Sequence, residues 1–457
     1  MKTYSNSILT STFSKRIIYL FIIMSAISVL LTNCKKNLGV PVPIPVPELT
    51  ITSISAINGL RNSAIIIKGS NFSNIMTDNI VKFNGIVAVV DSANSTRLLV
   101  TVPALATTGK ISVTVNSKTA TSAADFKLLS GSVTNFYDKY IEVIAVDVNS
   151  NLYGSDYVSG AFNSPNLAFG VLKISNAGVA GVFAGGATSG FFNGNGSSAR
   201  MDVISGIATD ASGNVFVADD NRIRKISPTG GVSTIAGGGA AGFADGQGTG
   251  AKFNYPVGLT VDALGNIYVC DSGNHRVRKI TPGGLVSTLA GNGIAGNVNG
   301  NNTSAQFSGP DAIVIDASGN LFVGDYQNFN IRKITPTGVV TTFAGSGVAG
   351  FVNGTGTKAQ FFYPQGMAID AAGNIFISDS DYNDNIYYVR MVNKAGFVST
   401  FLGDRSKGTL RDAQINYTVN FPDGLAFDPH GNMYFTNTGL ALNNVGGSYI
   451  SKVTFHY

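Results

Sequence analysis

Few side chains in this sequence are of the types that carry out catalysis. The 457 residues include two Glu, Glu48 and Glu142, and three His. The two Cys are Cys34 and Cys270, and Trp is absent. These counts nearly exclude mechanisms that use two glutamates and metal sites built from three histidines. The His-x-His and Cys-x-x-Cys spacings of zinc sites are also missing, and no nucleophile motif accompanies His275.

The larger, C-terminal part of the chain repeats one short pattern six times. Each copy begins with an Asp that is followed four residues later by Asn, and the first residues of the copies are Asp147, Asp210, Asp262, Asp316, Asp370 and Asp428. Nine residues after each start lies a second polar residue, namely Asp156, Asp219, Asp271, Asp325, Asp379 and Asn437. Repetition at this period indicates an architecture built from repeated units.

One copy shows what each unit is. Its apolar and β-branched runs predict strands over residues 258–262, 267–271, 276–281 and 285–290, with Gly-containing turns between them. Four antiparallel strands repeated around an axis form the blade of a β-propeller. The WD40 class is excluded by the missing Trp and the longer period.

The ends of the repeat region complete each other. The sixth copy ends with a predicted third strand over residues 449–455, so its fourth strand is missing. Residues 131–136 resemble a fourth strand such as 339–343 and lie just before the first copy. We predict that this N-terminal strand completes the last blade and leaves no open edge in the ring.

The repeats resemble a known family. The strings Asp271–Ile280 and Asp219–Ile226 are similar to NHL repeats, and the resemblance extends over residues 131–457. It implies that residues 130–457 form a six-bladed NHL-type β-propeller.

The loops between blades carry two further regular features. An apolar residue expected to plug the gap between blades recurs as Met201, Phe253, Phe307, Phe361 and Ile415. Upstream of it lie turn-forming pairs that begin at Asn193, Asp245, Asn299 and Asn353. We interpret these pairs as turns, with calcium binding as the alternative.

A smaller β-domain precedes the propeller. Short apolar runs at 49–54, 64–68, 80–83, 97–102 and 110–115 alternate with turn residues, as in a β-sandwich. Together with the motifs around Gly69–Phe72 and Val81–Gly85, they resemble an IPT/TIG immunoglobulin-like domain. We assign it to residues 48–129. In that family the domain is commonly a spacer or an interaction module.

The N-terminal segment has the features of a targeting signal. Lys15 and Arg16 precede the uncharged apolar run 17–31, which has the length of a signal-peptide core. The run ends before Cys34 and resembles a bacterial lipoprotein signal, which implies cleavage after residue 33 and a lipid on Cys34. An ordinary secretory signal and an uncleaved anchor are the alternatives. The Pro-rich residues 34–47 would then be a stiff linker.

One position of the propeller repeat brings oxygen atoms to the central channel. It precedes the first-strand Gly, and its six occupants are Glu142, Ser205, Val257, Asp311, Gln365 and Asp423. Six-bladed lactonases of the gluconolactonase and regucalcin class resemble this ring, which implies a metal such as Ca²⁺ at Glu142, Asp311, Gln365 and Asp423. A solvent-facing position is also polar without binding a metal, so both interpretations stay open.

Basic residues recur on the third strands without predicting a nucleic-acid partner. The string comprises Arg222, Arg224, Lys225, Arg276, Arg278, Lys279, Arg332 and Lys333. Its fixed position in each repeat is what packing between blades would produce. Without residues 1–33 the chain carries 28 Lys and Arg against 26 Asp and Glu, which gives no strong positive field.

These features favour a binding protein over an enzyme. We expect a lipid-anchored, extracytoplasmic protein at a bacterial outer membrane or cell surface, whose propeller faces bind a protein or a polysaccharide. Aromatic residues outside the repeat pattern are candidates for that surface or fill gaps between blades: Phe191, Phe192, Tyr382, Tyr387 and Tyr388. The alternative is a metal-dependent, lactonase-like hydrolase with Ca²⁺ or Zn²⁺ in the channel. No cofactor is certain.

Overall fold

The computed structural model describes residues 48–55, 57–157, 169–186, 188–381, 386–403, 419, 421–438 and 449–456. The predicted signal segment, Cys34, the linker up to residue 47, Tyr382 and Ile415 lie outside these residues. In the described part of the chain, no helix has both the length and the apolar character needed to cross a membrane.

The N-terminal domain is a sandwich of two antiparallel sheets. One sheet has the order β1 (Thr50–Ser55), β3 (Ala64–Ser70), β7 (Arg97–Thr101), β6 (Val89–Asn94). The other has the order β5 (Ile86–Val87), β4 (Ile80–Phe83), β8 (Ile111–Val115), β9 (Lys118–Thr121). The short strands β2 (Asn58–Gly59) and β10 (Lys127–Leu128) pair in parallel. Alternate residues of the two sheets, such as Ile67, Leu98 and Val113, are fully buried between them and form the core.

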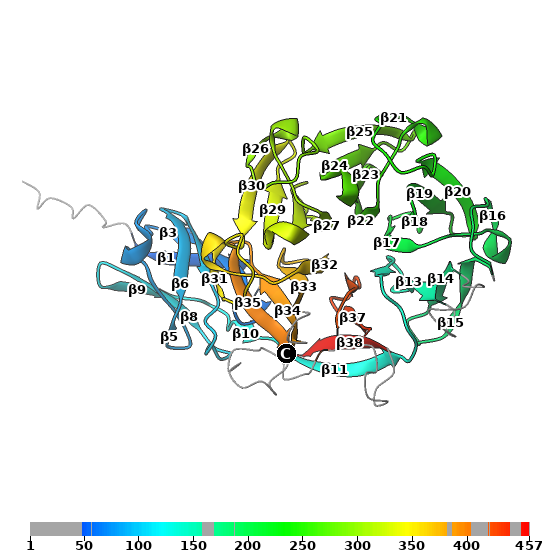
Figure 1. The fold of residues 1–457 in the computed structure, drawn as a ribbon. Coiled ribbons are helices and arrows are strands. Elements are labelled where there is room, and N and C mark those ends of the chain that lie inside the picture. Colours follow the sequence, from blue (N-terminus) through cyan, green and yellow to red (C-terminus); the bar gives the residue numbers. More distant parts are fainter. Residues whose placement is uncertain are drawn as a thin grey trace, which may run out of the picture. The chain divides into compact units, whose positions relative to one another are not determined.

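Six further sheets form the blades of a propeller in the described residues (Figure 1). The first blade contains β12 (Ile144–Val146), β13 (Leu152–Tyr157), β14 (Phe169–Ile174) and β15 (Ala180–Gly185). The second contains β17 (Ile204–Thr209), β18 (Val215–Asp219), β19 (Arg222–Ile226) and β20 (Gly231–Ala236). The third contains β22 (Pro256–Val261), β23 (Ile267–Asp271), β24 (Arg276–Ile280) and β25 (Leu285–Ala290). The strands predicted for this third unit agree with these bounds to within two residues.

The remaining blades repeat the same order. The fourth contains β27 (Pro310–Ile315), β28 (Leu321–Asp325), β29 (Asn330–Ile334) and β30 (Val339–Ala344). The fifth contains β32 (Pro364–Ile369), β33 (Ile375–Asp381), β34 (Ile386–Val392) and β35 (Phe397–Gly403). The sixth contains β36 (Leu425–Phe427), β37 (Met433–Asn437), β38 (Tyr449–His456) and β11 (Ser130–Tyr137).

Short elements decorate the blades. A two-residue strand extends four of the sheets, namely β16 (Gly194–Asn195), β21 (Gly246–Gln247), β26 (Gly300–Asn301) and β31 (Gly354–Thr355). The single-turn 3₁₀ helices are η1 (Met76–Asp78), η2 (Gly196–Ser198), η3 (Gly248–Gly250), η4 (Ser272–Asn274), η5 (Asn302–Ser304), η6 (Tyr326–Asn328) and η7 (Gly356–Lys358).

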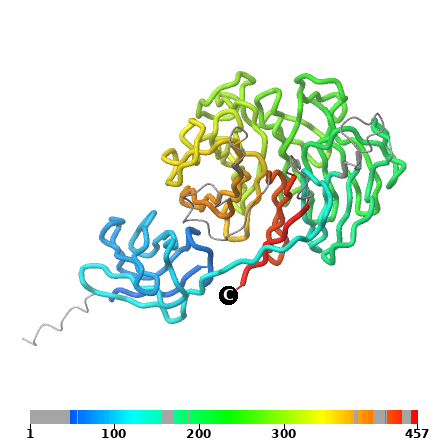
Figure 2. The backbone as a smooth tube through the Cα atoms, turned by 60° about the horizontal axis from the view of Figure 1, so that its bottom comes forward, coloured from blue at the N-terminus to red at the C-terminus, as the bar shows by residue number. Residues whose placement is uncertain are grey.

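The closure predicted from the sequence is confirmed. Strand β11 pairs antiparallel with β38, with Val133 opposite Val453, and so supplies the fourth strand of the last blade. Figure 2 shows β11 and the C-terminal strand side by side. The ring therefore closes by hydrogen bonds between segments that are more than 300 residues apart in the sequence.

The repeated Asp is a turn former. Asp262 Oδ1 accepts hydrogen bonds from the backbone N–H groups of Leu264, at 2.9 Å, and Asn266, at 2.8 Å. Its Oδ2 accepts a third bond from the Asn266 side chain at 2.8 Å. Gly265 has φ +80°, a conformation that favours glycine. This motif fixes the hairpin between the first two strands of a blade and carries no reactive group.

Apolar side chains seal the gaps between blades. The predicted plug residues Met201, Phe253, Phe307 and Phe361 are all fully buried in cores that unite neighbouring blades. The first strand of each blade also contacts the first strands of both neighbours, so these six strands surround the channel.

Candidate functional site

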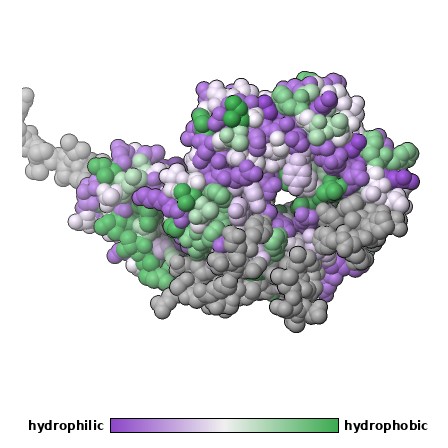
Figure 3. Space-filling view, viewed as in Figure 1, coloured by the Kyte–Doolittle hydropathy of each residue, from purple (hydrophilic) through white to green (hydrophobic). Residues whose placement is uncertain are grey.

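The six channel positions singled out in the sequence line one cavity. The cavity has a volume of about 210 Å³, and its lining includes Glu142, Ser205, Val257, Asp311, Gln365 and Asp423. All six side chains are half-buried. Figure 3 shows this face of the propeller with its central opening, which hydrophilic residues border in part.

Glycine next to the ring position sets how closely the inner strands approach. A Cβ atom on Gly258 would collide with the Asp311 carbonyl, and one on Gly366 would collide with the Asp423 carbonyl. A Cβ on Gly424 would lie 2.8 Å from the Glu142 carbonyl oxygen. In these blades the absence of a side chain therefore lets the inner strand pack against the backbone of the next channel residue.

Two threonines of the sixth blade form hydrogen bonds with Asp423 and with the backbone of Glu142. Thr438 Oγ1 donates a hydrogen bond to Asp423 Oδ2 at 2.6 Å. Thr436 Oγ1 accepts from the backbone N–H groups of Asp423, at 3.2 Å, and Gly424, at 2.8 Å. It also donates to the Glu142 carbonyl at 3.3 Å, so it connects the sixth blade to the first.

The carboxyl groups in the cavity repel one another. Burial and then the charge of Glu142 raise the pKa of Asp311 to about 7. The pKa of Asp423 is also raised to about 7, by burial and by the charges of Glu142 and Asp311, against the hydrogen bond from Thr438. Among the described residues that line the cavity there is no Lys, Arg or His. A cation placed beside Asp311 and Asp423 would therefore favour their charged forms.

Three tyrosines lie close to these carboxyl groups. Burial raises the pKa of Tyr140, and the charges of Glu142 and Asp423 raise it further. Burial likewise raises the pKa of Tyr255, with contributions from Asp311 and Glu142. The Tyr255 side chain is 61% exposed and lines the cavity. Tyr255 is therefore a lining residue that solvent can reach.

Tyr387 is the third of these tyrosines. The sequence analysis included it among the aromatic residues outside the repeat pattern but did not predict that it lies near the channel. Burial and the charge of Asp423 raise its pKa, which places its phenol near the ring. It packs against Phe421 with 5.2 Å between ring centroids. Tyr140 and Tyr255 were missed altogether; both lie within two residues of a ring position, and that proximity was the available signal.

The other predicted aromatic residues divide into two kinds. Phe191 is 45% exposed and stacks on Arg222, with 4.1 Å from the guanidinium carbon to the ring centroid. Phe192 is 58% exposed. Tyr388 is buried and stacks on Phe351 at 4.2 Å. Of the two alternatives predicted for Tyr388, burial favours the filling of a gap over a ligand surface.

The ring does not fit a metal ion in its present arrangement. Among the described residues, no group of three or more His, Cys, Asp and Glu side chains lies close enough to hold one. Ca²⁺ needs six to eight oxygen ligands. The calcium role of Glu142, Asp311, Gln365 and Asp423 therefore stays a prediction.

The recurring arginines are structural. Four of them are fully buried, each paired with an Asp on the second strand of its blade: Arg224 with Asp219, Arg278 with Asp271, Arg332 with Asp325 and Arg390 with Asp379. The nitrogen–oxygen distances run from 2.5 to 2.9 Å. Because these guanidinium groups are out of solvent, they cannot contact a phosphate backbone.

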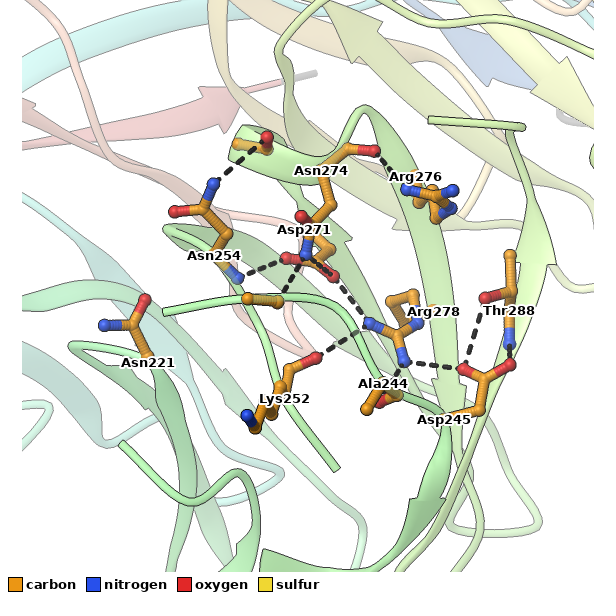
Figure 4. Close-up of polar contacts among 12 residues, drawn as sticks. Asn221, Ala244, Asp245, Lys252, Asn254, Asp271, Asn274, Arg276, Arg278 and Thr288 are labelled. Atoms are coloured by element: carbon orange, nitrogen blue, oxygen red, sulfur yellow. Dashed lines mark hydrogen bonds and ion pairs between the residues drawn. The ribbon is translucent and has the colours of Figure 1, made fainter. Parts of the chain in front are cut away.

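Figure 4 shows one of these networks, around Arg278. Its Nη1 donates to Asp271, at 2.6 Å, and to the Lys252 carbonyl, at 3.1 Å. Its Nη2 donates to the Ala244 carbonyl, at 2.9 Å, and to Asp245, at 2.6 Å. The turn-forming pairs thus have a role that their composition did not reveal: their first residue binds the buried arginine of the blade.

Cys270 and two histidines hold structural positions. Cys270 is buried and free, and burial raises the pKa of its thiol, so it is a poor nucleophile. His275 has φ +52°, and its Nδ1 accepts a hydrogen bond from the Gly309 N–H at 3.1 Å. His456 contacts Ser132 at 2.8 Å across the closing strands.

Comparisons with known proteins agree with this architecture. Residues 49–128 match the model of the IPT/TIG domain, and residues 253–280 match that of the NHL repeat. A structural genomics protein of unknown function from Bacteroides thetaiotaomicron has the same fold, at 19% identity and TM-score 0.51, covering 90% of this chain and 99% of that one. The chain thus contains an IPT/TIG domain and an NHL repeat, and it folds as the sequence predicted, as an immunoglobulin-like sandwich and a six-bladed propeller.

Curated relatives share part of the chain. "Protein SUPPRESSOR OF QUENCHING 1, chloroplastic" from Arabidopsis thaliana is 37% identical over 131 residues, which are 26% of this chain and 12% of that protein. "NHL repeat-containing protein 2" from Gallus gallus is 36% identical over 134 residues, again 26% of this chain and 18% of the relative. The chain spans less than a fifth of the length of these relatives.

Proposed function

We propose that the protein is an extracytoplasmic binding protein whose propeller recognises a protein or polysaccharide partner at the channel face. One observation carries this proposal: the channel cavity gathers three carboxyl groups and neighbouring tyrosines on a rigid ring. Such a site offers hydrogen-bond acceptors, negative charge and aromatic surface, which suit recognition. In the described residues, the conspicuous Asp–Arg pairs are buried in the scaffold, and the free cysteine is buried as well.

We further propose the division of the chain that its composition suggests. Residues 1–33 are a signal segment, Cys34 carries a lipid, and residues 34–47 tether the IPT/TIG domain at 48–129. That domain would act as a spacer before the propeller at 130–457. Metabolic labelling with a radioactive fatty acid tests the anchor: the chain should incorporate label, and Cys34→Ala should abolish it. Label retained by Cys34→Ala would refute lipidation at this residue.

Capture of partners tests the binding role. The immobilised full chain would be exposed to extracts of surface proteins and to a panel of polysaccharides. The double variant Asp311→Asn/Asp423→Asn should capture less of the specific partner than the wild type. The matched control is Asp125→Asn, which removes a charge from the exposed pair with Lys110 in the other domain. If the wild type, the double variant and Asp125→Asn all fail to retain a partner, the proposal is contradicted.

A further inference from the structure

Carboxylates that are buried in the scaffold have bonding partners. Asp147 and Asp428, for example, each accept hydrogen bonds from a backbone N–H group and an Asn side chain of their turn. Four aspartates on the second strands are almost completely shielded from solvent, and each is bonded to a buried arginine within 2.9 Å. This pairing offsets the cost of removing charge from water. Asp271, for example, faces Arg278 and also accepts a bond from Asn274 at 2.8 Å.

The channel aspartates have fewer partners. The Asp311 side chain has neither a hydrogen-bond partner nor an ion pair among the described residues. Asp423 is bonded to the neutral Thr438 alone through its carboxylate. No described residue that lines the cavity is basic. Within the described part of the chain, the protein thus supplies no cation to these two aspartates.

The size of the cavity limits what can supply the cation. About 210 Å³ is less than the roughly 300–1,000 Å³ of pockets that hold drug-sized molecules. It suits one extended side chain. A bare metal ion is disfavoured because no three His, Cys, Asp or Glu side chains of the described residues lie close enough together to hold one. A neutral sugar would leave their charge uncompensated.

The aromatic groups around the cavity also suit a cationic side chain as the ligand. Tyr255 stands at the opening, and Tyr140 and Tyr387 lie near the carboxylates. Guanidinium and ammonium groups bind favourably over aromatic rings. The protein itself uses this contact, since Arg276 lies 3.9 Å from the ring centroid of Phe243.

We propose that the channel cavity binds the basic side chain, lysine or arginine, of a protein partner. The inference rests on the proposed binding function and narrows it to a protein that projects a cation into the ring. The guanidinium or ammonium group would pair with Asp311 and Asp423, and Tyr255 would cover the aliphatic part of the side chain.

Calorimetric titration of the full chain with small probes tests the inference. The probes are Nα-acetyl-arginine amide and Nα-acetyl-lysine amide, with Nα-acetyl-citrulline amide as the neutral isostere of arginine. Calcium chloride and a chitosan oligosaccharide form two further arms. We expect both cationic amino-acid amides to bind, with citrulline at least tenfold weaker. Asp311→Asn/Asp423→Asn should lose at least tenfold in affinity, and Asp125→Asn should bind as the wild type does.

Several results would overturn the inference. These are equal binding of arginine and citrulline amides, unchanged affinity in the double variant, binding of calcium alone, or tighter binding of the chitosan oligosaccharide than of the amino-acid amides. A thermal melt of each variant shows that a loss of binding is not a loss of folding. If the double variant still captures a partner as the wild type does, the inference fails while the proposed binding function stands.

Discussion

At the scale of single residues, the same side-chain chemistry serves two purposes. An aspartate at the end of a second strand is bonded to a buried arginine, whereas an aspartate at the start of a first strand faces the channel without one. Asp325 and Asp311 illustrate the two cases within one blade. The first belongs to the scaffold, and the second is available to a ligand.

The buried pairs should matter strongly for stability. In Asp325→Ala, Arg332 would remain buried without its counter-charge, and breaking such a pair costs about 3–5 kcal/mol. Urea unfolding followed by fluorescence or circular dichroism measures the loss. The control Lys358→Ala removes an exposed charge and should change stability by less than about 0.5 kcal/mol. A similar small effect for Asp325→Ala would show that the pair is dispensable.

The channel carboxyls should make stability depend on pH. Their folded-state pKa values, about 7, exceed the ordinary value of 3.8, so the folded state binds more protons between pH 4 and 7. The free energy of unfolding contributed by these groups therefore falls as pH rises through this window. Asp311→Asn/Asp423→Asn should melt near the wild type at pH 4 and above it at pH 8. A constant difference at all pH values would contradict the raised pKa values.

At the scale of elements, the inner strands decide where the ring residues lie. A glycine after the ring position removes the side chain that would otherwise hold neighbouring strands apart. The ring residue then points into the channel while its carbonyl lies against the glycine of the preceding blade. The site is thus a product of strand packing rather than of a loop.

Gly366→Ala tests this packing. Its new Cβ would collide with the Asp423 carbonyl, and forcing atoms into a packed region costs about 1–3 kcal/mol. Thermal unfolding should show a lower melting temperature for this variant. Gly181→Ala is the matched control, because a Cβ there meets no atom within 4 Å, and its melting temperature should hardly change. Equal melting temperatures for the two variants would refute the close approach.

At the scale of the whole molecule, the ring is held by the pairing of β11 with β38. This closure is the contact between the two ends of the repeat region, and it covers the outer edge of the sixth blade. The first and last blades also share a hydrophobic cluster that includes Leu172 and Tyr434.

Truncation after residue 448 should open the ring. It removes β38 and leaves β11 without its partner, so β37 becomes an exposed edge. We expect loss of cooperative unfolding and concentration-dependent association, measured by calorimetry and by light scattering. A control truncation after residue 456 removes one residue beyond β38 and should behave as the full chain does. If the chain that ends at residue 448 is monomeric and unfolds cooperatively, the role of ring closure is contradicted.

The sequence by itself determined the architecture, because the repeat is local. The Asp-initiated turns, the alternation within strands and the missing fourth strand are visible in linear order, and they specified six blades and their closure. The six channel positions were also found this way, since each is defined by its distance from a conserved feature of the repeat, such as Gly258 or Gly366.

Only the tertiary structure decided what those residues face. Asp271 and Asp311 look alike in the sequence, yet one meets Arg278 and the other meets an open cavity. Tyr255 and Tyr387 come together at the channel from blades that are distant in the sequence, whereas Tyr388 turns away and is buried. Burial and charge pairing depend on neighbours that the chain brings together only when the ring closes, and this is why the character of the site could not be read in advance.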